Sequence, residues 1–355
     1  MNDETLQTAA AWAARGDDVA LATVVRTYRS APRPIGSVFA VSSSGEMAGS
    51  VSGGCVEGDI YGAAQRLFKG EGEAPQLIHY GISDDQALSV GLACGGELWV
   101  ALDRWRPPAA LRRGAVARVY GGDQHGRALV VDADAGTAEG DLDGDLRATA
   151  EAAIAEAVAT ETSSATDLEG GVTLFVESIH PAPRLVVVGA VDTAEALCRM
   201  ARTLGWRTAV VDPRGKFATP ERVPSADELL VSWPDVAYPE LALEAADHLV
   251  VLTHDPKIDD PAIALALQAG VGYVGALGSR RTQEQRNQRL REEAGCAPEQ
   301  VDRIHGPVGL DIGAHTPAET AVAILAEIIA YRSGRGGQRL RDTTGSIHPA
   351  AAPSA

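Results

Sequence analysis

A cysteine that follows two glycines is the part of this sequence best suited to chemistry. Residues 50–58 read Ser-Val-Ser-Gly-Gly-Cys-Val-Glu-Gly. An apolar stripe at helical spacing begins there: Val56, Ile60, Ala63 and Leu67. Cys55 is therefore predicted to stand at a helix start, where unpaired N–H groups and the positive dipole end lower a thiol pKa. The resulting thiolate would ligate a soft metal or attack sulfur, and Gly53 and Gly54 would let a ligand approach the backbone.

A second cysteine has similar glycine-rich surroundings, in Gly91-Leu-Ala-Cys-Gly-Gly96. The alternative for any cysteine of this kind is a small hydrophobic residue in a core, and we interpret Cys198 and Cys296 that way. For Cys55 the helix start favours function over packing. For Cys94 the two interpretations stand even, because no amphipathic helix clearly follows it. The spacing of Cys55 and Cys94 matches no paired-cysteine zinc pattern.

The composition indicates a globular protein with room for two domains. The chain has 355 residues, of which 45% are hydrophobic, and a formal net charge of −17. Such an acidic surface repels phosphate backbones and anionic lipid, so we expect no nucleic acid and no membrane as a partner. The start Met-Asn-Asp-Glu-Thr-Leu lacks the features of a signal peptide, and the four scattered cysteines suit a reducing compartment. These features predict a cytoplasmic location.

The first 105 residues predict an α+β domain that carries both cysteine loops. A helix over 4–14 precedes strands over 20–28, 37–41, 76–80 and 97–102. Between the first two strands, two prolines exclude a helix and make a rigid, exposed loop with Arg29 and Arg33. Residues 106–180 predict connecting strands over 115–120, 128–132 and 172–178, an acidic helix near 146–158 and a polar loop over 161–170. Pro181-Ala-Pro183 is typical of a domain linker.

From residue 184 the pattern changes to alternating strands and helices, which is typical of a doubly wound parallel sheet. Strands are predicted over 185–188, 207–211, 249–252 and 272–276, and helices over 193–204, 259–269 and 281–294. Thr316 is predicted as the N-cap of a last helix, with Glu319 completing a capping box. The fold class is therefore α/β, with a Rossmann-like domain over 184–335 and a disordered, apolar-poor tail over 336–355.

The first turn of this second domain lacks most of the dinucleotide fingerprint. It reads Gly189-Ala-Val-Asp-Thr-Ala194, so that Val191 stands where the second glycine would let a pyrophosphate approach. Asp192 adds a negative charge at the helix start that a phosphate would need. Asp212 lies where a ribose-binding acid would sit, and its alternative role is a hydrogen bond at the strand end. These departures argue against NAD(P) binding.

Two later loops are better suited to an anion. Gly278-Ser-Arg-Arg281 lies between a strand and a helix, in the region where such sheets bind ligands. Its N–H groups and the guanidiniums of Arg280 and Arg281 suit a phosphate, although a solvated helix start explains the motif equally well. The Gly-rich loop 305–315 ends on a helix N-cap, and its length favours a function, with Asp311 as its polar head.

Together these motifs resemble the XdhC/CoxI family, which are accessory proteins of molybdenum hydroxylases such as xanthine dehydrogenase and aerobic carbon monoxide dehydrogenase. The N-terminal match rests on Ser30-Ala-Pro-Arg-Pro-Ile-Gly36 and on residues 49–57 and 91–96. The C-terminal match rests on Val211-Asp-Pro-Arg214 and on residues 278–281, 306–314 and 316–317. The chain departs from the family where Gly189-Ala-Val-Asp192 replaces a usual Gly-Ala-Gly-His turn, and where Ala93 replaces a usual glycine.

The resemblance implies an accessory protein rather than an enzyme. Such a protein would bind molybdenum cofactor, protect it while the terminal sulfido ligand is installed, and deliver it to an apo molybdenum hydroxylase. A cysteine desulfurase is a further implied partner, and a homodimer is one option for the oligomeric state. Molybdenum in a dithiolene is a soft centre that Cys55 would contact. The pterin phosphate would be held by Gly278 to Arg281, and Arg33 would meet it from the other domain across a crevice.

Two other functions are alternatives to this one. An NAD(P)-dependent oxidoreductase would use the Rossmann-like domain, but Val191 and Asp192 argue against it. A molybdenum hydroxylase would need two iron–sulfur clusters with about four cysteine ligands each. The chain has 4 cysteines in all, which excludes that enzyme.

Overall fold

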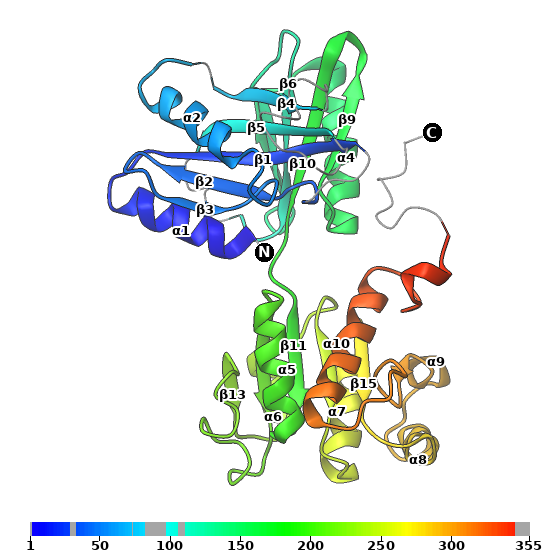
Figure 1. The fold of residues 1–355 in the computed structure, drawn as a ribbon. Helices are drawn as coiled ribbons and strands as arrows, with labels where there is room; N and C mark the ends of the chain where they lie inside the picture. Colours follow the sequence, from blue (N-terminus) through cyan, green and yellow to red (C-terminus); the bar gives the residue numbers. More distant parts are fainter. Residues whose placement is uncertain (1, 29–32, 73, 82–96, 106–110, 345–355) are drawn as a thin grey trace. The chain divides into compact units, whose positions relative to one another are not determined.

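The computed structural model describes residues 2–28, 33–72, 74–81, 97–105 and 111–344. The chain divides into two compact units, Met1–Pro181 and Ala182–Ala355 (Figure 1). The predicted loop around Cys94 lies outside the described residues, as does the end of the predicted tail. The described part of that tail holds a 3-10 turn, Leu340–Asp342.

The first sheet of unit 1 is antiparallel, with strand order β3-β2-β1-β5-β4. Its elements are α1 (Asn2–Ala14), β1 (Val19–Tyr28), β2 (Val38–Ser42), β3 (Met47–Gly49), α2 (Glu57–Phe68), β4 (Gln76–Tyr80) and β5 (Glu97–Trp105). Helix α2 buries the predicted stripe of Ile60, Ala63 and Leu67 against one face of the sheet. Helix α1 packs on the other face through Ala9 and Trp12. The two faces follow from the alternation of side chains along the strands.

The second sheet of unit 1 is also antiparallel, with strand order β8-β7-β6-β10-β9, and is covered by one helix. It comprises β6 (Gly114–Tyr120), β7 (Ala128–Asp132), β8 (Thr137–Gly140), α4 (Gly144–Thr160), β9 (Ser164–Leu168) and β10 (Val172–Ile179). The prediction of a polar loop over 161–170 was wrong, because β9 pairs with β10 along the sheet edge. Strand β8 was missed for the same reason: an edge strand needs hydrogen bonds from one neighbour and no apolar alternation.

Unit 2 is a parallel sheet with helices on both faces, which confirms the predicted Rossmann-like fold. The six strands run in the order β13-β12-β11-β14-β15-β16. They are β11 (Arg184–Val188), β12 (Arg207–Val211), β13 (Glu228–Leu230), β14 (His248–Val251), β15 (Tyr273–Ala276) and β16 (Ile304–His305). The helices are α5 (Asp192–Thr203), α6 (Pro234–Leu241), α7 (Pro256–Gln268), α8 (Arg280–Glu292), α9 (Pro298–Val301) and α10 (Pro317–Arg332).

The core of unit 2 lies on both sides of this sheet. Helices α5 and α10 share one apolar cluster with the sheet, and α6, α7 and α8 share the other. Cys198 and Cys296 are buried in these clusters, as their packing interpretation predicted. The capping box of Thr316 and Glu319 is also confirmed, with the Glu319 N–H donating to the Thr316 hydroxyl at 3.2 Å.

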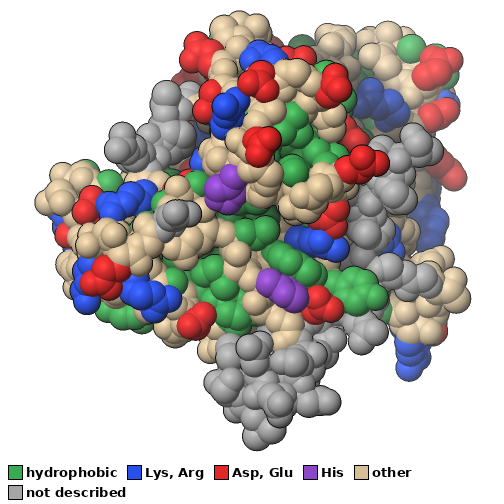
Figure 2. Space-filling model, turned by 90° about the horizontal axis from the view of Figure 1, so that it is seen from above, with side chains coloured by type: hydrophobic (Ala, Val, Ile, Leu, Met, Phe, Trp, Pro, Cys, Tyr) green, Lys and Arg blue, Asp and Glu red, His purple; other side chains and the backbone are tan. Residues whose placement is uncertain are grey.

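Two observations concern the surface. In the part of the chain that the structure describes, every helix is too short or too polar to cross a membrane. On the face drawn in Figure 2, Lys and Arg side chains are interspersed with Asp and Glu, and hydrophobic side chains are exposed between them. Basic charge is therefore not gathered into one patch on that face.

Candidate functional site

The Cys55 loop, residues 50–56, is held by hydrogen bonds to one carboxylate. This carboxylate is that of Glu57, at the first position of α2. The Ser50 hydroxyl donates to Glu57 Oε1 at 2.6 Å, and the Ser52 hydroxyl donates to Oε2. Four backbone N–H groups donate to the same oxygens at 2.8–3.2 Å: those of Val51, Ser52, Gly54 and Val56. Burial raises the pKa of Glu57, but the hydrogen bonds from Ser50 and Ser52 outweigh it and lower the pKa to about 2.

These hydrogen bonds contradict the expectation that unpaired N–H groups would make Cys55 reactive. The helix start was expected to offer unpaired N–H groups, yet the N–H groups of Cys55 and Val56 donate to the Ser52 hydroxyl at 2.9 and 3.0 Å. The Glu57 carboxylate also places a negative charge where an unopposed dipole end was expected. The loop therefore holds Cys55 in a fixed position, and the N–H groups of Cys55 and Val56 are not spare donors.

Cys55 itself is half-buried and packs against the core of the first sheet. Gly53 and Gly54 have φ values of +78° and +114°, and a Cβ on either would meet no atom within 4 Å. Glycine is needed there for the left-handed backbone, and the outer side of the loop has room for a ligand. Arg33 is half-buried and lines a pocket together with Ser50 of the same loop. The structure thus brings Arg33 close to the Cys55 loop within unit 1.

In unit 2 the topology gathers several predicted segments at one edge of the sheet. All six strands are parallel, so their carboxyl ends lie along the same edge. The Gly189 turn follows β11, Asp212 follows β12, and the Gly278 loop follows β15. The sheet order reverses between β11 and β14, and ligands of such sheets bind at this switch point.

Asp212 is occupied by protein partners at that edge. It is buried, its Oδ2 accepts from the Ala190 N–H at 2.8 Å, and the Arg214 guanidinium donates to both of its oxygens at 2.7 and 2.9 Å. Burial raises the pKa of Asp212, but the hydrogen bonds from Arg214 and Ala190 outweigh it and lower the pKa. Asp212 therefore has the strand-end role that was its alternative. The exposed Asp192 carboxylate pairs with Arg222 at 3.3 Å.

The Gly278 loop begins α8. The Ser279 hydroxyl caps the helix by accepting from the Thr282 N–H at 3.1 Å, and Gly278 has a φ of +153°. Arg280 and Arg281 are exposed in the first turn of the helix. Their guanidiniums and the helix start form a surface that suits an anion.

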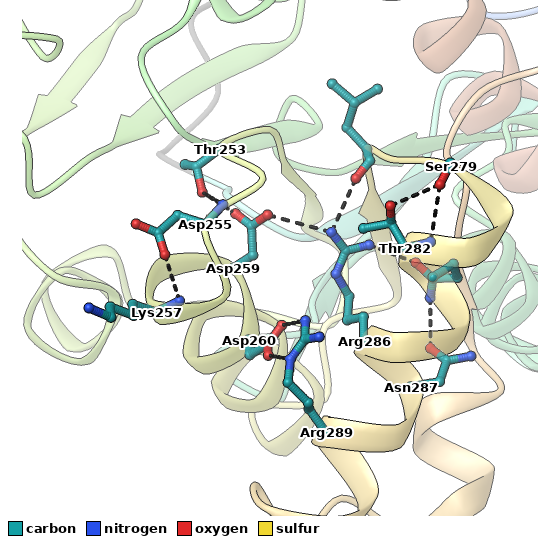
Figure 3. A network of polar contacts seen from close by, with 12 residues as sticks. Thr253, Asp255, Lys257, Asp259, Asp260, Ser279, Thr282, Arg286, Asn287 and Arg289 are labelled. Atoms are coloured by element: carbon teal, nitrogen blue, oxygen red, sulfur yellow. Dashed lines mark hydrogen bonds and ion pairs between the residues drawn. The ribbon is translucent and has the colours of Figure 1, made fainter.

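A buried ion pair links α8 to α7 next to this loop (Figure 3). Arg286 of α8 lies 3.5 Å from Asp259 of α7, and both side chains are almost completely buried. Arg286 also donates to the Leu277 carbonyl at 3.1 Å, and the Thr253 hydroxyl donates to Asp259 at 2.6 Å. The pair therefore joins the segments that follow β14 and β15.

The loop over 305–315 is held by Glu327 of α10. His305 Nδ1 lies 2.7 Å from Glu327 Oε1, and the Gly309 N–H donates to Oε2. Burial raises the pKa of Glu327, but the His305 and Gly309 hydrogen bonds outweigh it and lower the pKa. Asp311 is exposed at the surface of the loop. The sequence signal for Glu327 was a single acid within the apolar stretch of the last helix.

One candidate residue was missed by sequence reasoning. His254 is exposed and has a φ of +61°, in the segment that follows β14 at the switch point. Its signal was Thr-His-Asp-Pro directly after an apolar strand. Among the described residues, no three His, Cys, Asp or Glu side chains are grouped so that they could hold a metal ion. A single soft contact through Cys55 is a different kind of site from such a cluster.

The chain matches two family models, one in each unit. Residues 12–81 match the XdhC and CoxI family, and residues 185–328 match the XdhC Rossmann domain. A Bacillus halodurans crystal structure described as a xanthine dehydrogenase has the same fold. Its TM-score is 0.74 at 22% identity, over 94% of this chain and 98% of that one.

Curated relatives cover most of the chain. A Bacillus subtilis protein named as a probable xanthine dehydrogenase subunit is 28% identical over 332 residues, which is 89% of this chain and 94% of that protein. The molybdenum cofactor insertion chaperone PaoD of Escherichia coli is 26% identical over 321 residues, or 89% and 84% of the two chains. These matches, over both units and in order, show that the chain belongs to the XdhC and CoxI family.

Proposed function

We propose that this protein binds molybdenum cofactor and delivers it to a molybdenum hydroxylase of the xanthine dehydrogenase or carbon monoxide dehydrogenase type. The observation that carries the proposal is the similarity, along 89% of the chain, to a protein named as a molybdenum cofactor insertion chaperone. The protein would act as an accessory factor rather than as a catalyst, with the apo hydroxylase and a cysteine desulfurase as its partners.

Cys55 is the residue that we assign to the molybdenum end of the cargo. Its thiol is half-buried, stands on a loop fixed by Glu57, and has open space beside Gly53 and Gly54. A thiol sulfur is a soft ligand and suits a molybdenum–dithiolene centre. We assign the phosphate end to Arg33, Arg280 and Arg281, because guanidiniums bind phosphate through charge-assisted hydrogen bonds. Asp311 and Cys94 remain proposed site residues without an assigned contact.

Replacement of the thiol tests the assignment. The full chain is purified from a molybdate-replete host, and molybdenum and pterin are measured per chain. We expect Cys55→Ser to lose both while its thermal unfolding is unchanged, because a hydroxyl is a poor ligand for a soft metal. The matched control is Cys296→Ala, which removes a buried thiol far along the sequence and should retain the cargo.

The experiment distinguishes the role of Cys55 from the proposed function of the protein. Equal cargo in Cys55→Ser and the unaltered protein would contradict the role of Cys55. Absence of molybdenum and pterin from the unaltered protein, under conditions that load a molybdenum hydroxylase in the same cells, would contradict the proposed function itself.

A further inference from the structure

Unit 1 contains a polar pocket of about 400 Å³ beside the Cys55 loop, and most of its lining residues come from outside that loop. It lies where α1, β2 and the end of β3 meet, and its volume is within the range of small-molecule sites. Its lining combines one carboxylate, one guanidinium and several hydroxyls: Glu4, Thr5, Thr8, Arg33, Ser37 and Ser50. This lining offers both hydrogen-bond acceptors and donors to a ligand.

The packing of α1 on the sheet fixes the shape of this pocket. Gly49 has a φ of +78°, and a Cβ there would collide with the Val38 carbonyl oxygen and lie 2.8 Å from the Thr5 hydroxyl. Thr5 and Ser37 are only 7% and 9% exposed. Because these hydroxyls are held by a buried interface, the pocket is formed before any ligand arrives, which lowers the entropic cost of binding.

Ser50 joins the pocket to the Cys55 loop. It lines the pocket, and its hydroxyl donates to Glu57 and accepts from the Gly53 N–H at 2.8 Å. A ligand that occupies the pocket therefore lies against the same loop that carries Cys55.

We propose that this pocket binds the pterin ring system of the molybdenum cofactor, an inference that rests on the proposed function. The aminopyrimidinone edge of a pterin presents two adjacent N–H donors, which a carboxylate such as Glu4 accepts in parallel. The pterin also carries a carbonyl oxygen and a phosphate, and these find donors in the pocket hydroxyls and Arg33. A free phosphate fits less well, because the Glu4 carboxylate repels an anion that brings no donors.

A metal-free pterin tests the pocket without involving Cys55. The probe is neopterin monophosphate, titrated into the full chain by calorimetry, with inorganic phosphate as the comparison ligand. We expect the pterin to bind much more tightly than phosphate, and Glu4→Gln to weaken it by about tenfold through loss of a charge-assisted contact. Glu71→Gln is the matched control, because Glu71 is an exposed carboxylate of unit 1 that does not line the pocket.

A second variant keeps the outcome clear. Arg33→Gln should also weaken the binding of neopterin monophosphate by about tenfold, because it removes the guanidinium that would contact the phosphate. The proposal is overturned if neopterin monophosphate does not bind, if it binds no better than phosphate, or if Glu4→Gln and Arg33→Gln bind it as the unaltered protein does. If the protein nevertheless retains molybdenum through Cys55, the pocket assignment fails and the proposed function stands.

Discussion

Single carboxylates organise three loops of this protein. Glu57 holds the Cys55 loop, Glu327 holds the loop after β16, and Asp212 joins the Gly189 turn to Arg214. Irregular loops leave backbone N–H groups without helix or sheet partners, and one carboxylate with two oxygens can accept from several of them. The hydrogen bonds lower the pKa of each of these carboxyls, so the loops are held by ionised groups at neutral pH.

At this scale the sequence predicted the position of Cys55 but not its surroundings. The apolar stripe after Cys55 was sufficient to place a helix start there. The role of Glu57 depends on the backbone conformation of residues 50–56, which brings their donors to its carboxylate. Apolar periodicity carries no information about the conformation of such a loop. The expectation of unpaired N–H groups did not take into account that the side chain of Glu57, the first residue of the helix, would accept hydrogen bonds from them.

Replacement of Glu57 by glutamine should destabilise the protein by about 2 kcal/mol or more at neutral pH, since an amide offers one acceptor oxygen where the loop needs two. The folded-state pKa of Glu57 is lowered from 4.5 to about 2, so its stabilisation is complete above pH 4.5 and is lost as the pH falls towards 2. The difference between Glu57→Gln and the unaltered protein in urea unfolding should therefore shrink over that range. A difference that stays constant with pH would contradict the role of the charge, and Glu71→Gln serves as the control.

At the scale of elements, apolar periodicity predicted most of the strands and helices that build the cores, although α6 in unit 2 was missed. In unit 2 the strands β11, β12, β14 and β15 were all predicted, because strands buried on both faces are apolar runs. The edge strands β8 and β9 were missed, because their side chains are largely exposed and their pairing comes from a neighbour. The buried pair of Asp259 and Arg286 was also missed, since charged residues on a helix are usually solvated.

This pair gives a prediction about how α7 and α8 are joined. Arg286→Met should cost about 3–5 kcal/mol, because it leaves Asp259 buried without a countercharge. The double variant Asp259→Leu with Arg286→Met should recover most of that loss, since apolar side chains of similar volume replace a costly desolvated pair. Urea unfolding of the two single variants and the double variant measures the coupling.

The neighbouring pair offers a matched control. Arg289 and Asp260 join the same two helices at 2.5 Å but are more exposed, at 28% and 14%. Arg289→Met should therefore cost clearly less than Arg286→Met, because more exposed ion pairs contribute about 1 kcal/mol or less. Equal losses in the two variants would show that burial of the pair is not what matters.

At the scale of the whole molecule, each unit has guanidiniums that we propose as phosphate ligands. Arg33 lines the unit 1 pocket, and Arg280 and Arg281 are exposed at the start of α8 in unit 2. The fold class was predictable because both units follow simple patterns of strands and helices. That the two sets of arginines grip the same phosphate stays a prediction, because pattern and spacing within each unit do not determine it.

Variants in both units, made in the full chain, test whether the two sets of arginines bind the same phosphate. Arg281→Ala should reduce the affinity for cofactor by about tenfold, the loss expected for one charge-assisted contact. Arg291→Ala is the matched control, because Arg291 is an exposed arginine near the other end of α8 that pairs with Asp302 at 2.9 Å. If Arg281 and Arg33 bind one phosphate, Arg281→Ala combined with Arg33→Gln should lose less than the sum of the single losses, since either change weakens the hold on the same group. Strictly additive losses would indicate separate anions, and an Arg281→Ala variant that retains pterin as well as Arg291→Ala does would remove unit 2 from the site.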